Sequence, residues 1–282
     1  MNDASAVRRR RLRTGLSYGV LVAIAVVFLF PFVIAVVTSF KTEPDATANP
    51  LTLIPSPFTT EAYSQLFKDQ DFLLWVKNSV IVTLSVTFFR VFLDSLAGYA
   101  LARLRFRGRA AVFTTIVAVM AVPGVVLLIP KFLMIRQLGI YDTYQGMIIP
   151  LLVDAAGIFI MKNFFESIPV SVEESARIDG ASLFRIYWSI VLPMAWPALI
   201  TLFILSFQGS WNELAHFIIS AQSTSLNTLT KGVAQLASGQ LGSGNRYPLK
   251  LAASVLMTIP VAILFFIFQR RIMNASAGAV KE

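Results

Sequence analysis

Long apolar stretches separated by short charged segments recur along the whole chain. Five of these stretches hold at most one charged residue each, and they span residues 16–38, 110–130, 145–161, 186–212 and 251–268. A sixth stretch, 75–102, is interrupted by Lys77, Arg90 and Asp94. Their lengths approach or exceed the roughly 20 residues that a helix needs to cross a bilayer. The pattern therefore predicts an all-α integral membrane protein with six transmembrane helices.

The composition excludes an ordinary soluble protein and the charges indicate an orientation. Only 14% of the 282 residues are charged, against about 25% in a soluble domain. Lys and Arg number 24 and Asp and Glu 15, an excess that is also typical of nucleic-acid-binding proteins. More than half of the basic residues, however, lie in segments on the same side as the two termini. Because cytoplasmic loops carry an excess of Lys and Arg, we expect both termini in the cytoplasm and a lipid bilayer, with no nucleic acid, as the partner.

These features divide the chain into a basic cytoplasmic N-terminus (1–15), a transmembrane domain (16–268) and a cytoplasmic tail (269–282). The first apolar stretch has 23 residues, whereas the apolar region of a cleaved signal peptide has about 7–15. This length favours a first transmembrane helix over a signal peptide.

Two loops on the outer side are long enough to form structure of their own, residues 39–71 and 213–250. The first contains four prolines, which are typical of turns. The segment that follows Thr60 predicts a short helix with Thr60 as its N-terminal cap. We therefore expect a small extracytoplasmic cap.

The cytoplasmic loop 166–192, between the fourth and fifth spans, is the most informative segment. Ser171 and Glu174 have the spacing of a capping box, which predicts a short helix over 172–179. Gly180 then stands where the end of a helix needs a left-handed residue. Ser182 can cap a second short helix, which runs toward Ile190. A solvated linker that lies along the membrane would fit the same pattern.

The loop resembles the EAA loop of the membrane subunits of ABC importers. The matching residues are Glu174-Ser175-Ala176, Gly180 and Ile190-Val191-Leu192-Pro193, with Ser175 in place of the usual second alanine. In that family the loop forms coupling helices that dock in a groove of a separate ATPase subunit. The resemblance gives Glu174 a charged contact with the ATPase and Gly180 the bend. The residues assigned to coupling on this basis are Glu173, Glu174, Ser175, Ala176, Asp179, Gly180, Ala181, Ile190, Leu192 and Pro193.

Shorter motifs in the same order resemble the carbohydrate importers of the maltose type over nearly the whole chain. They are Asn78-Ser79, the segment 97–103 with 107–109, Trp211-Asn212-Glu213, Pro260 with 269–271, and the tail 278–281. The chain ends in Glu282 where that family typically has glycine. The resemblance implies the fold of a type I ABC importer permease in a bacterial or archaeal cell (inner) membrane.

The chain contains no Gly-x-x-x-x-Gly-Lys-Ser/Thr run, the loop that binds the phosphates of ATP. We therefore expect no enzyme activity and no cofactor in this chain, with ATP and Mg²⁺ bound by a partner ATPase. The resemblance implies two cytoplasmic ABC ATPases and a second permease, and it favours a sister protein over a second copy. It also implies an extracytoplasmic sugar-binding protein that delivers a sugar substrate to the loops 39–71 and 213–250.

Charges inside the spans should face protein or water, because a charge at the bilayer centre costs about 2.5–3.5 kcal/mol. Arg90 and Asp94 are four residues apart on one helix face and we expect them to form an ion pair. Asp154 in the fourth span could bind a sugar hydroxyl or bond to a neighbouring span. At the outer end of the fifth span, Trp211-Asn212-Glu213 is a further candidate for the substrate path.

The prolines in the spans can be ordinary kinks or flexing points. Each removes a backbone donor and loosens the helix locally. The functional version of this hypothesis is that Pro123-Gly124 and Pro193 flex during alternating access.

Other functions are less consistent with the sequence. The run Gly15-Leu16-Ser17-Tyr18-Gly19 fits a nucleophile elbow, but it opens a membrane span, and the only histidine, His216, is predicted on the opposite side of the membrane. An ion-coupled secondary transporter would show an internal repeat and several intramembrane carboxylates. An assembly factor would not need the coupling-loop spacing. An ABC importer of a polyol or a glycerol phosphodiester remains an alternative to a sugar importer.

Overall fold

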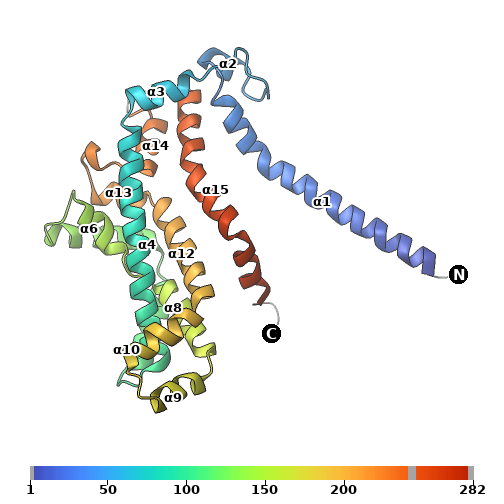
Figure 1. Ribbon diagram of the computed structural model, residues 1–282. Coiled ribbons are helices and arrows are strands. Elements are labelled where there is room, and N and C mark those ends of the chain that lie inside the picture. Colours follow the sequence, from blue (N-terminus) through green and yellow to red (C-terminus); the bar gives the residue numbers. More distant parts are fainter. Residues whose placement is uncertain (1–2, 241–245, 279–282) are drawn as a thin grey trace. The chain divides into compact units, whose positions relative to one another are not determined.

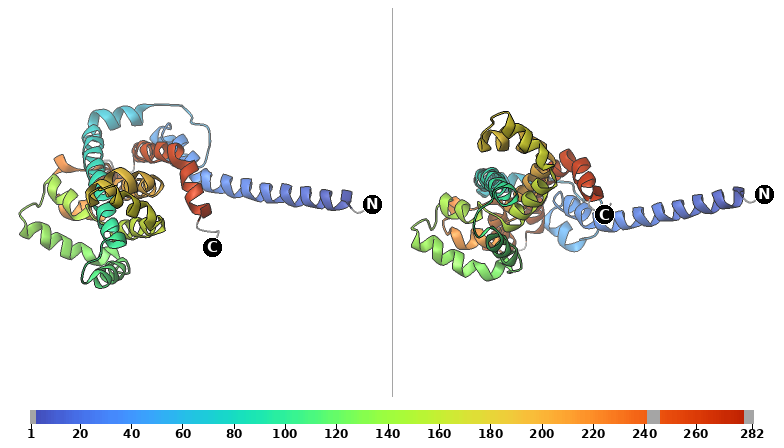
Figure 2. Two further views of the ribbon diagram at one scale, coloured as in Figure 1. Left: turned by 60° about the horizontal axis from the view of Figure 1, so that its bottom comes forward. Right: turned by 90° about the horizontal axis from the view of Figure 1, so that it is seen from below.

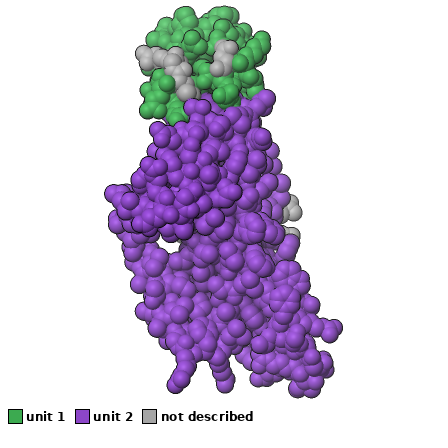
Figure 3. All heavy atoms as spheres, turned by 90° about the vertical axis from the view of Figure 1, so that its left-hand side faces the viewer, with its two compact units in different colours: residues 1–71, 235–258 green, residues 72–234, 259–282 purple. Residues whose placement is uncertain are grey.

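A computed structural model describes residues 3–240 and 246–278, with side chains for 14–269 except residues 69 and 241–245. The described residues are helices joined by short connections, with no strand among them. The chain forms two compact units (Figure 3). Unit 1 comprises residues 1–71 and 235–258, and unit 2 comprises 72–234 and 259–282. The all-α prediction is therefore correct for the described part of the chain.

Unit 1 contains the first candidate span and the predicted outer cap. Its helices are α1 (Asp3–Thr38), α2 (Glu43–Ala48), α3 (Glu61–Asp69) and the first part of α15 (Tyr247–Gly278). The large side chains of α1 from Leu16 onward are exposed almost all round, as in a helix that contacts lipid or another protein. The helix predicted after Thr60 is α3, although the side chain of Thr60 makes no cap bond. Thr59 Oγ1 instead accepts the hydrogen bond from the N–H of Glu61 at 3.1 Å.

Unit 2 is built on one long helix, α4 (Phe72–Arg103), which packs against α8 (Ala155–Ser167) and α12 (Trp196–Trp211) (Figures 1 and 2). Two glycines allow this packing. A Cβ atom on Gly98 would lie 2.7 Å from Met161 Cβ and 2.9 Å from Lys162 N, and one on Gly157 would lie 2.1 Å from Asp94 Oδ2. Small residues at a helix interface let two backbones approach closely, as is typical of membrane proteins.

Three of the six expected spans are bent rather than straight. In the third, α5 (Arg109–Met120) is followed by η1 (Gly124–Leu127) and α6 (Leu128–Gln137) at 103°. In the fourth, α7 (Tyr144–Ile148) with η2 (Ile149–Leu151) meets α8 at 41°. In the fifth, the 183–194 segment meets α12 at 79°. By length and composition, the described residues contain three straight candidate spans, and up to six if each bent pair is one span.

Each bend has a local cause in the sequence. Pro123 and Pro197 stand at the starts of the second halves of the third and fifth spans, because a proline needs no N–H partner at the start of a helix. In the fourth span, Asp154 caps the start of α8 by accepting a hydrogen bond from Gly157 N at 3.0 Å. The apolar stretches of the third, fourth and fifth spans are thus long enough to cross a membrane, but none of them is a single helix.

The segment after α12 folds back along α4 at one end of unit 2. It forms α13 (Ala215–Ser220), η4 (Thr224–Leu226) and α14 (Leu229–Ala237). The Asn78-Ser79 motif holds it in place: Asn78 Nδ2 donates to the carbonyls of Ser225 (2.9 Å) and Asn227 (2.8 Å), and Ser79 Oγ accepts from Leu229 N at 2.7 Å. The segments α9 (Val170–Ile178) and α10 (Leu183–Ile186) lie at the other end of unit 2 (Figure 1).

We expect Gly98→Ala and Gly157→Ala each to lower the stability of the chain by about 1–3 kcal/mol, because the added methyl group overpacks the α4–α8 interface. Thermal unfolding of the purified chain in detergent, followed by circular dichroism, measures this as a lower Tm. Gly19→Ala is the control, since a Cβ there meets no atom within 4 Å. Unchanged melting of both interface variants would contradict the described packing.

Candidate functional site

The loop 166–192 folds as two short helices, as predicted, but the first begins earlier than the capping box implies. Helix α9 starts at Val170 with Pro169 as its N-cap, and no side chain caps it. Ser171 therefore lies inside the first turn and is exposed to solvent. The predicted capping box between Ser171 and Glu174 is wrong, because Pro169 needs no N–H partner and the helix begins at Val170, two residues earlier than predicted.

The end of α9 is a turn that requires glycine. Gly180 has φ +79°, a left-handed conformation that residues with a Cβ rarely adopt. Its N–H donates to the carbonyl of Arg177 at 3.0 Å, and the N–H of Ala181 donates to that of Ala176 at 2.9 Å. This pair of bonds is a Schellman motif. Ser182 then caps α10 by accepting from Arg185 N, so the predictions for Gly180 and Ser182 agree with the structure.

Two adjacent glutamates of α9 have opposite environments. The side chain of Glu173 is only 2% exposed, and its Oε1 lies 2.8 Å from Nε of Arg103, the last residue of α4. Tyr99 OH, one turn earlier on α4, donates to Glu173 Oε2 at 3.2 Å. Arg103 also donates to the carbonyl of Ile168. Glu174, the residue of the resemblance motif, is exposed. Glu173 therefore ties α9 to α4, and Glu174 is free to meet a partner.

The residues assigned to coupling divide in the same way. Glu174, Ser175, Asp179, Gly180 and Pro193 are exposed. Ala176 is buried in the hydrophobic cluster of unit 2, and Ala181, Ile190 and Leu192 pack against it. Ala176 is buried and holds the loop in place, whereas Ala181, Ile190 and Leu192 are half-buried.

Two exposed apolar residues of the loop 166–192 were not predicted from the sequence as candidates for a contact with a partner. Ile178 is 87% exposed and Phe184 is 71% exposed, and the Phe184 ring stacks on Trp188 with centroids 6.1 Å apart. Large apolar side chains in so exposed a place are typical of a protein-interaction surface. The sequence could have indicated them, because Ile178 and Phe184 stand on either side of the predicted turn at Gly180. We call the exposed residues Glu174, Ser175, Ile178, Asp179 and Phe184 the coupling surface.

The expected ion pair between Arg90 and Asp94 is not formed among the described side chains. Arg90 Nε donates to the carbonyl of Leu151 at 2.7 Å, and Asp94 Oδ1 accepts from the backbone N–H of Asp154 at 3.0 Å. Both groups bond to backbone of the broken fourth span, which offers a free acceptor and a free donor. The pairing prediction failed because the break between Leu151 and Ala155 frees backbone groups that bind these two side chains.

The substrate-path candidates lie partly together. Arg90 Nε donates to Leu151 of the fourth span, and a Cβ on Gly209 of α12 would lie 3.9 Å from Arg90 Nη1, so both spans approach its guanidinium, on which the charges of Asp154 and Glu213 act. Asn212 is exposed, whereas Trp211 is buried and stacks on Phe207 at 5.6 Å. The side chain of Trp211 thus packs within the protein, and Asp154, Asn212 and Glu213 are left as the polar candidates.

His216 is buried next to the same region. Its Nε2 lies 3.1 Å from the carbonyl oxygen of Met147, and its backbone N–H donates to Glu213 Oε1 at 2.9 Å. Burial lowers the pKa of His216, with the positive charge of Lys131 as a second cause. Among the described residues, no group of three or more His, Cys, Asp or Glu is suited to hold a metal ion.

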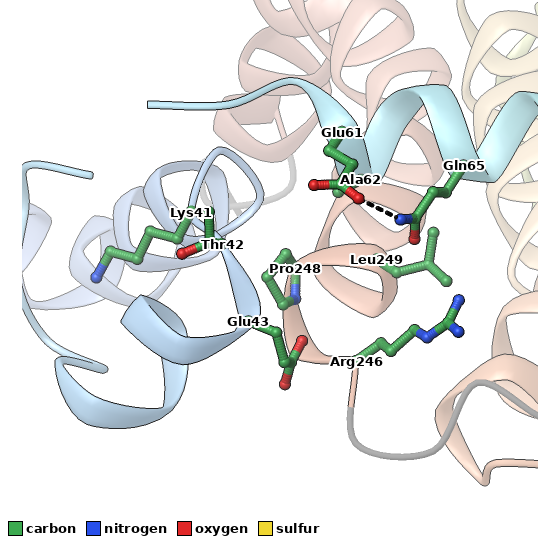
Figure 4. A pocket seen from close by; sticks show the side chains of 9 residues that line it. All are labelled: Lys41, Thr42, Glu43, Glu61, Ala62, Gln65, Arg246, Pro248 and Leu249. Carbon is green, nitrogen blue, oxygen red and sulfur yellow. Dashed lines mark hydrogen bonds between the residues drawn. The ribbon is translucent and has the colours of Figure 1, made fainter. Parts of the chain in front are cut away.

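Unit 1 carries a polar hollow of about 270 Å³. Its charged lining groups include Glu43, Glu61 and Arg246, while Pro248 and Leu249 are apolar (Figure 4). Glu61 Oε1 accepts from Gln65 Nε2 at 2.8 Å. Lys41 lines the hollow with its backbone end and turns its amino group away (Figure 4), where it donates to the carbonyl of Asn49 at 2.7 Å.

The sequence model of the inner membrane component of binding-protein-dependent transport systems matches residues 94–275. The chain belongs to this family. Its members are membrane transport components rather than enzymes, and they reside in the inner membrane. The match includes the whole loop 166–192 and most of unit 2.

Similar proteins cover this transport component almost from end to end. It is 36% identical to the sulfoquinovosyl glycerol transport system permease protein SmoH of Agrobacterium fabrum, over 90% of this chain and 89% of SmoH. It is 32% identical to the polygalacturonan/rhamnogalacturonan transport system permease protein YtcP of Bacillus subtilis, over 97% and 99%. A chain of a bacterial ABC transporter that imports the acidic polysaccharide alginate matches with a TM-score of 0.81 and 27% identity, over 93% of this chain and 97% of that one. The fold is that of an ABC importer permease.

We expect the two adjacent glutamates of α9 to respond differently to truncation. Glu173→Ala leaves Arg103 buried without its partner, and breaking a buried ion pair costs about 3–5 kcal/mol. Glu174→Ala changes an exposed side chain and should stay within about 0.5 kcal/mol. Thermal unfolding of the purified chain measures both, and equal Tm values for the two variants would exclude the structural role of Glu173.

We expect the chain to lose stability as the pH falls below about 6.5, the ordinary pKa of histidine. The folded pKa of His216 is lowered by burial, so the unfolded chain binds a proton first, and stability falls with falling pH. His216→Gln keeps a polar side chain without this titration. The loss of Tm between pH 7 and pH 5 should be smaller in this variant than in the native chain; an identical pH dependence would contradict the assignment.

Proposed function

We propose that this chain is one permease subunit of an ATP-driven ABC importer of a sugar or oligosaccharide. It would form the translocation path together with a second permease. The observation that carries the proposal is the coupling surface, which is anchored from inside the protein by the Glu173–Arg103 ion pair. The saccharide substrates in the names of SmoH and YtcP support a carbohydrate.

The coupling surface would dock in a groove of a cytoplasmic ATPase. Ile178 and Phe184 offer the apolar contact and Glu174 the charged contact, since interface centres are enriched in large apolar side chains with charges at the rim. ATP and Mg²⁺ would be bound by that ATPase, because the sequence of this chain contains no phosphate-binding loop. A movement received by α9 would reach α4 through Glu173, Tyr99 and Arg103.

The membrane orientation follows from the same assignment. If α9 and α10 face the cytoplasm, then α13 and Asn78 at the other end of unit 2 face the outside. The excess of Lys and Arg in the segments on the side of the termini supports cytoplasmic termini. The last residues, 279–282, for which a contact with the ATPases was expected, lie outside the described part of the chain.

On the outer side, an extracytoplasmic binding protein would deliver the sugar to the loops 39–71 and 213–250. The polar hollow lined by Glu43, Glu61 and Arg246 belongs to these loops and offers charged groups for such a contact. In the membrane, Asp154, Asn212 and Glu213 are the candidates to bind sugar hydroxyls, because carboxylate and amide oxygens accept hydrogen bonds from hydroxyl groups.

We expect Glu174→Lys to abolish most ATP-driven sugar uptake by the reconstituted complex. Reversing a charge at an interface juxtaposes like charges, which costs several kcal/mol, and each 1.4 kcal/mol lowers affinity about tenfold. Uptake of a labelled sugar into proteoliposomes, together with co-purification of the ATPase, measures the effect.

Glu166→Lys is the matched control for this charge reversal. Glu166 is also an exposed glutamate near the cytoplasmic end, but its partners are Lys162 (2.8 Å) and Arg109 (3.4 Å) of this same chain. Exposed ion pairs contribute about 0–1 kcal/mol, so uptake should remain near the native rate. Normal uptake in Glu174→Lys would refute the assignment of the coupling surface.

A further inference from the structure

The fourth candidate span is interrupted between η2 and α8, and the long helix α4 bonds to both sides of the interruption. In a continuous α-helix the N–H of Asp154 would donate to the carbonyl of Pro150, and the N–H of Ala155 to that of Leu151. At this break Asp94 Oδ1 accepts from Asp154 N at 3.0 Å, and Arg90 Nε donates to the carbonyl of Leu151 at 2.7 Å. Two side chains of α4 thus replace two helical backbone bonds.

The arrangement is specific to the two residues. Arg90 and Asp94 are four residues apart, so they lie on one face of α4, and one supplies a donor while the other supplies an acceptor. Asp94 is 0% exposed, and Gly157 leaves the room for its carboxylate, since a Cβ there would lie 2.1 Å from Oδ2. An unsatisfied backbone group in the membrane costs several kcal/mol, so these bonds strongly favour one geometry of the break.

The other two breaks are built differently. At the third span, Ala121 N donates to the carbonyl of Ala118, and at the fifth, Ala195 N donates to those of Val191 and Leu192. These are local backbone bonds. In the part of the chain that the structure describes, no side chain of another helix bonds to the backbone at residues 121–123 or 195.

We propose that Arg90 and Asp94 are positioning residues for transport, which hold the break of the fourth span at a constant angle. A displacement that enters at α9 then passes along α8 without changing the angle at residues 152–154. The change of shape is taken up at the breaks of the third and fifth spans, which lack such bonds. The role in transport rests on the proposed function, whereas the bonds at the break do not.

Distance measurements between spin labels test this directly. The chain contains no cysteine, so Ile149→Cys and Asn163→Cys place one label on each side of the fourth break, at exposed positions. The assembled complex in lipid is measured without nucleotide and with a non-hydrolysable ATP analogue. We expect the same narrow distance distribution in both states. The matched pair Val117→Cys and Leu133→Cys across the third break should show a distance that changes with nucleotide.

Two substitutions of Asp94 separate the bond from its charge. Asp94→Asn keeps an acceptor for Asp154 N and should keep both the narrow distribution and the native amount of sugar taken up per ATP hydrolysed. Asp94→Leu has a similar size but no acceptor, and should broaden the distribution and lower the uptake per ATP several-fold. If Asp94→Leu does not assemble, Arg90→Met takes its place and Arg90→Lys, which keeps a donor, is its control.

The proposal is overturned by any of three results. These are a distance across the fourth break that changes with nucleotide, a distance across the third break that does not, and a leucine or methionine variant with native distances and native uptake per ATP. Failure of the proposed function is distinguishable, because a native complex without ATP-driven uptake would refute that function while the nucleotide-free distances still report on the bonds.

Discussion

The direct approach of α4 to α8 is the constraint on which the rest of unit 2 depends. Gly98 lets α4 come close to the backbone of α8 at Lys162, and Gly157 leaves the space that the carboxylate of Asp94 occupies. The close approach brings the carboxylate of Asp94 within hydrogen-bonding distance of the start of α8. It also places the C-terminal end of α4 beside α9, where Arg103 meets Glu173. The helix break in the membrane and the anchor of the coupling surface therefore follow from one packing contact.

Polar groups in this protein are used mainly to fix backbone. Asn78 holds the segment after α12 through two carbonyls, Arg103 and Glu173 hold α9, and Asp154 caps α8. In lipid, apolar contacts supply little driving force for helix association, so hydrogen bonds and close packing specify the fold instead. This explains why so few charged residues suffice, and why several of them lie at helix ends or breaks.

Much of the fold was predictable from residues that act locally. The apolar stretches give the candidate spans, Gly180 gives the left-handed turn and Ser182 the cap of α10, because each depends only on neighbouring residues. The loop that carries the candidate site was predictable in outline as two short helices that meet at Gly180. Its division into buried and exposed members was not, because adjacent residues such as Glu173 and Glu174 differ only in what packs against them. The exposure of Ile178 and Phe184 depends on the same packing.

The sequence by itself determined that this is a polytopic helical membrane protein with a structured loop over 166–192, since hydrophobic length and local turn chemistry need no information about neighbours in space. Only the tertiary structure decided that Arg90 and Asp94 bond to the backbone of the fourth span rather than to each other, and that Glu173 is the internal anchor. These outcomes depend on contacts between segments roughly 60–70 residues apart, where the free backbone groups of one helix become the partners of another.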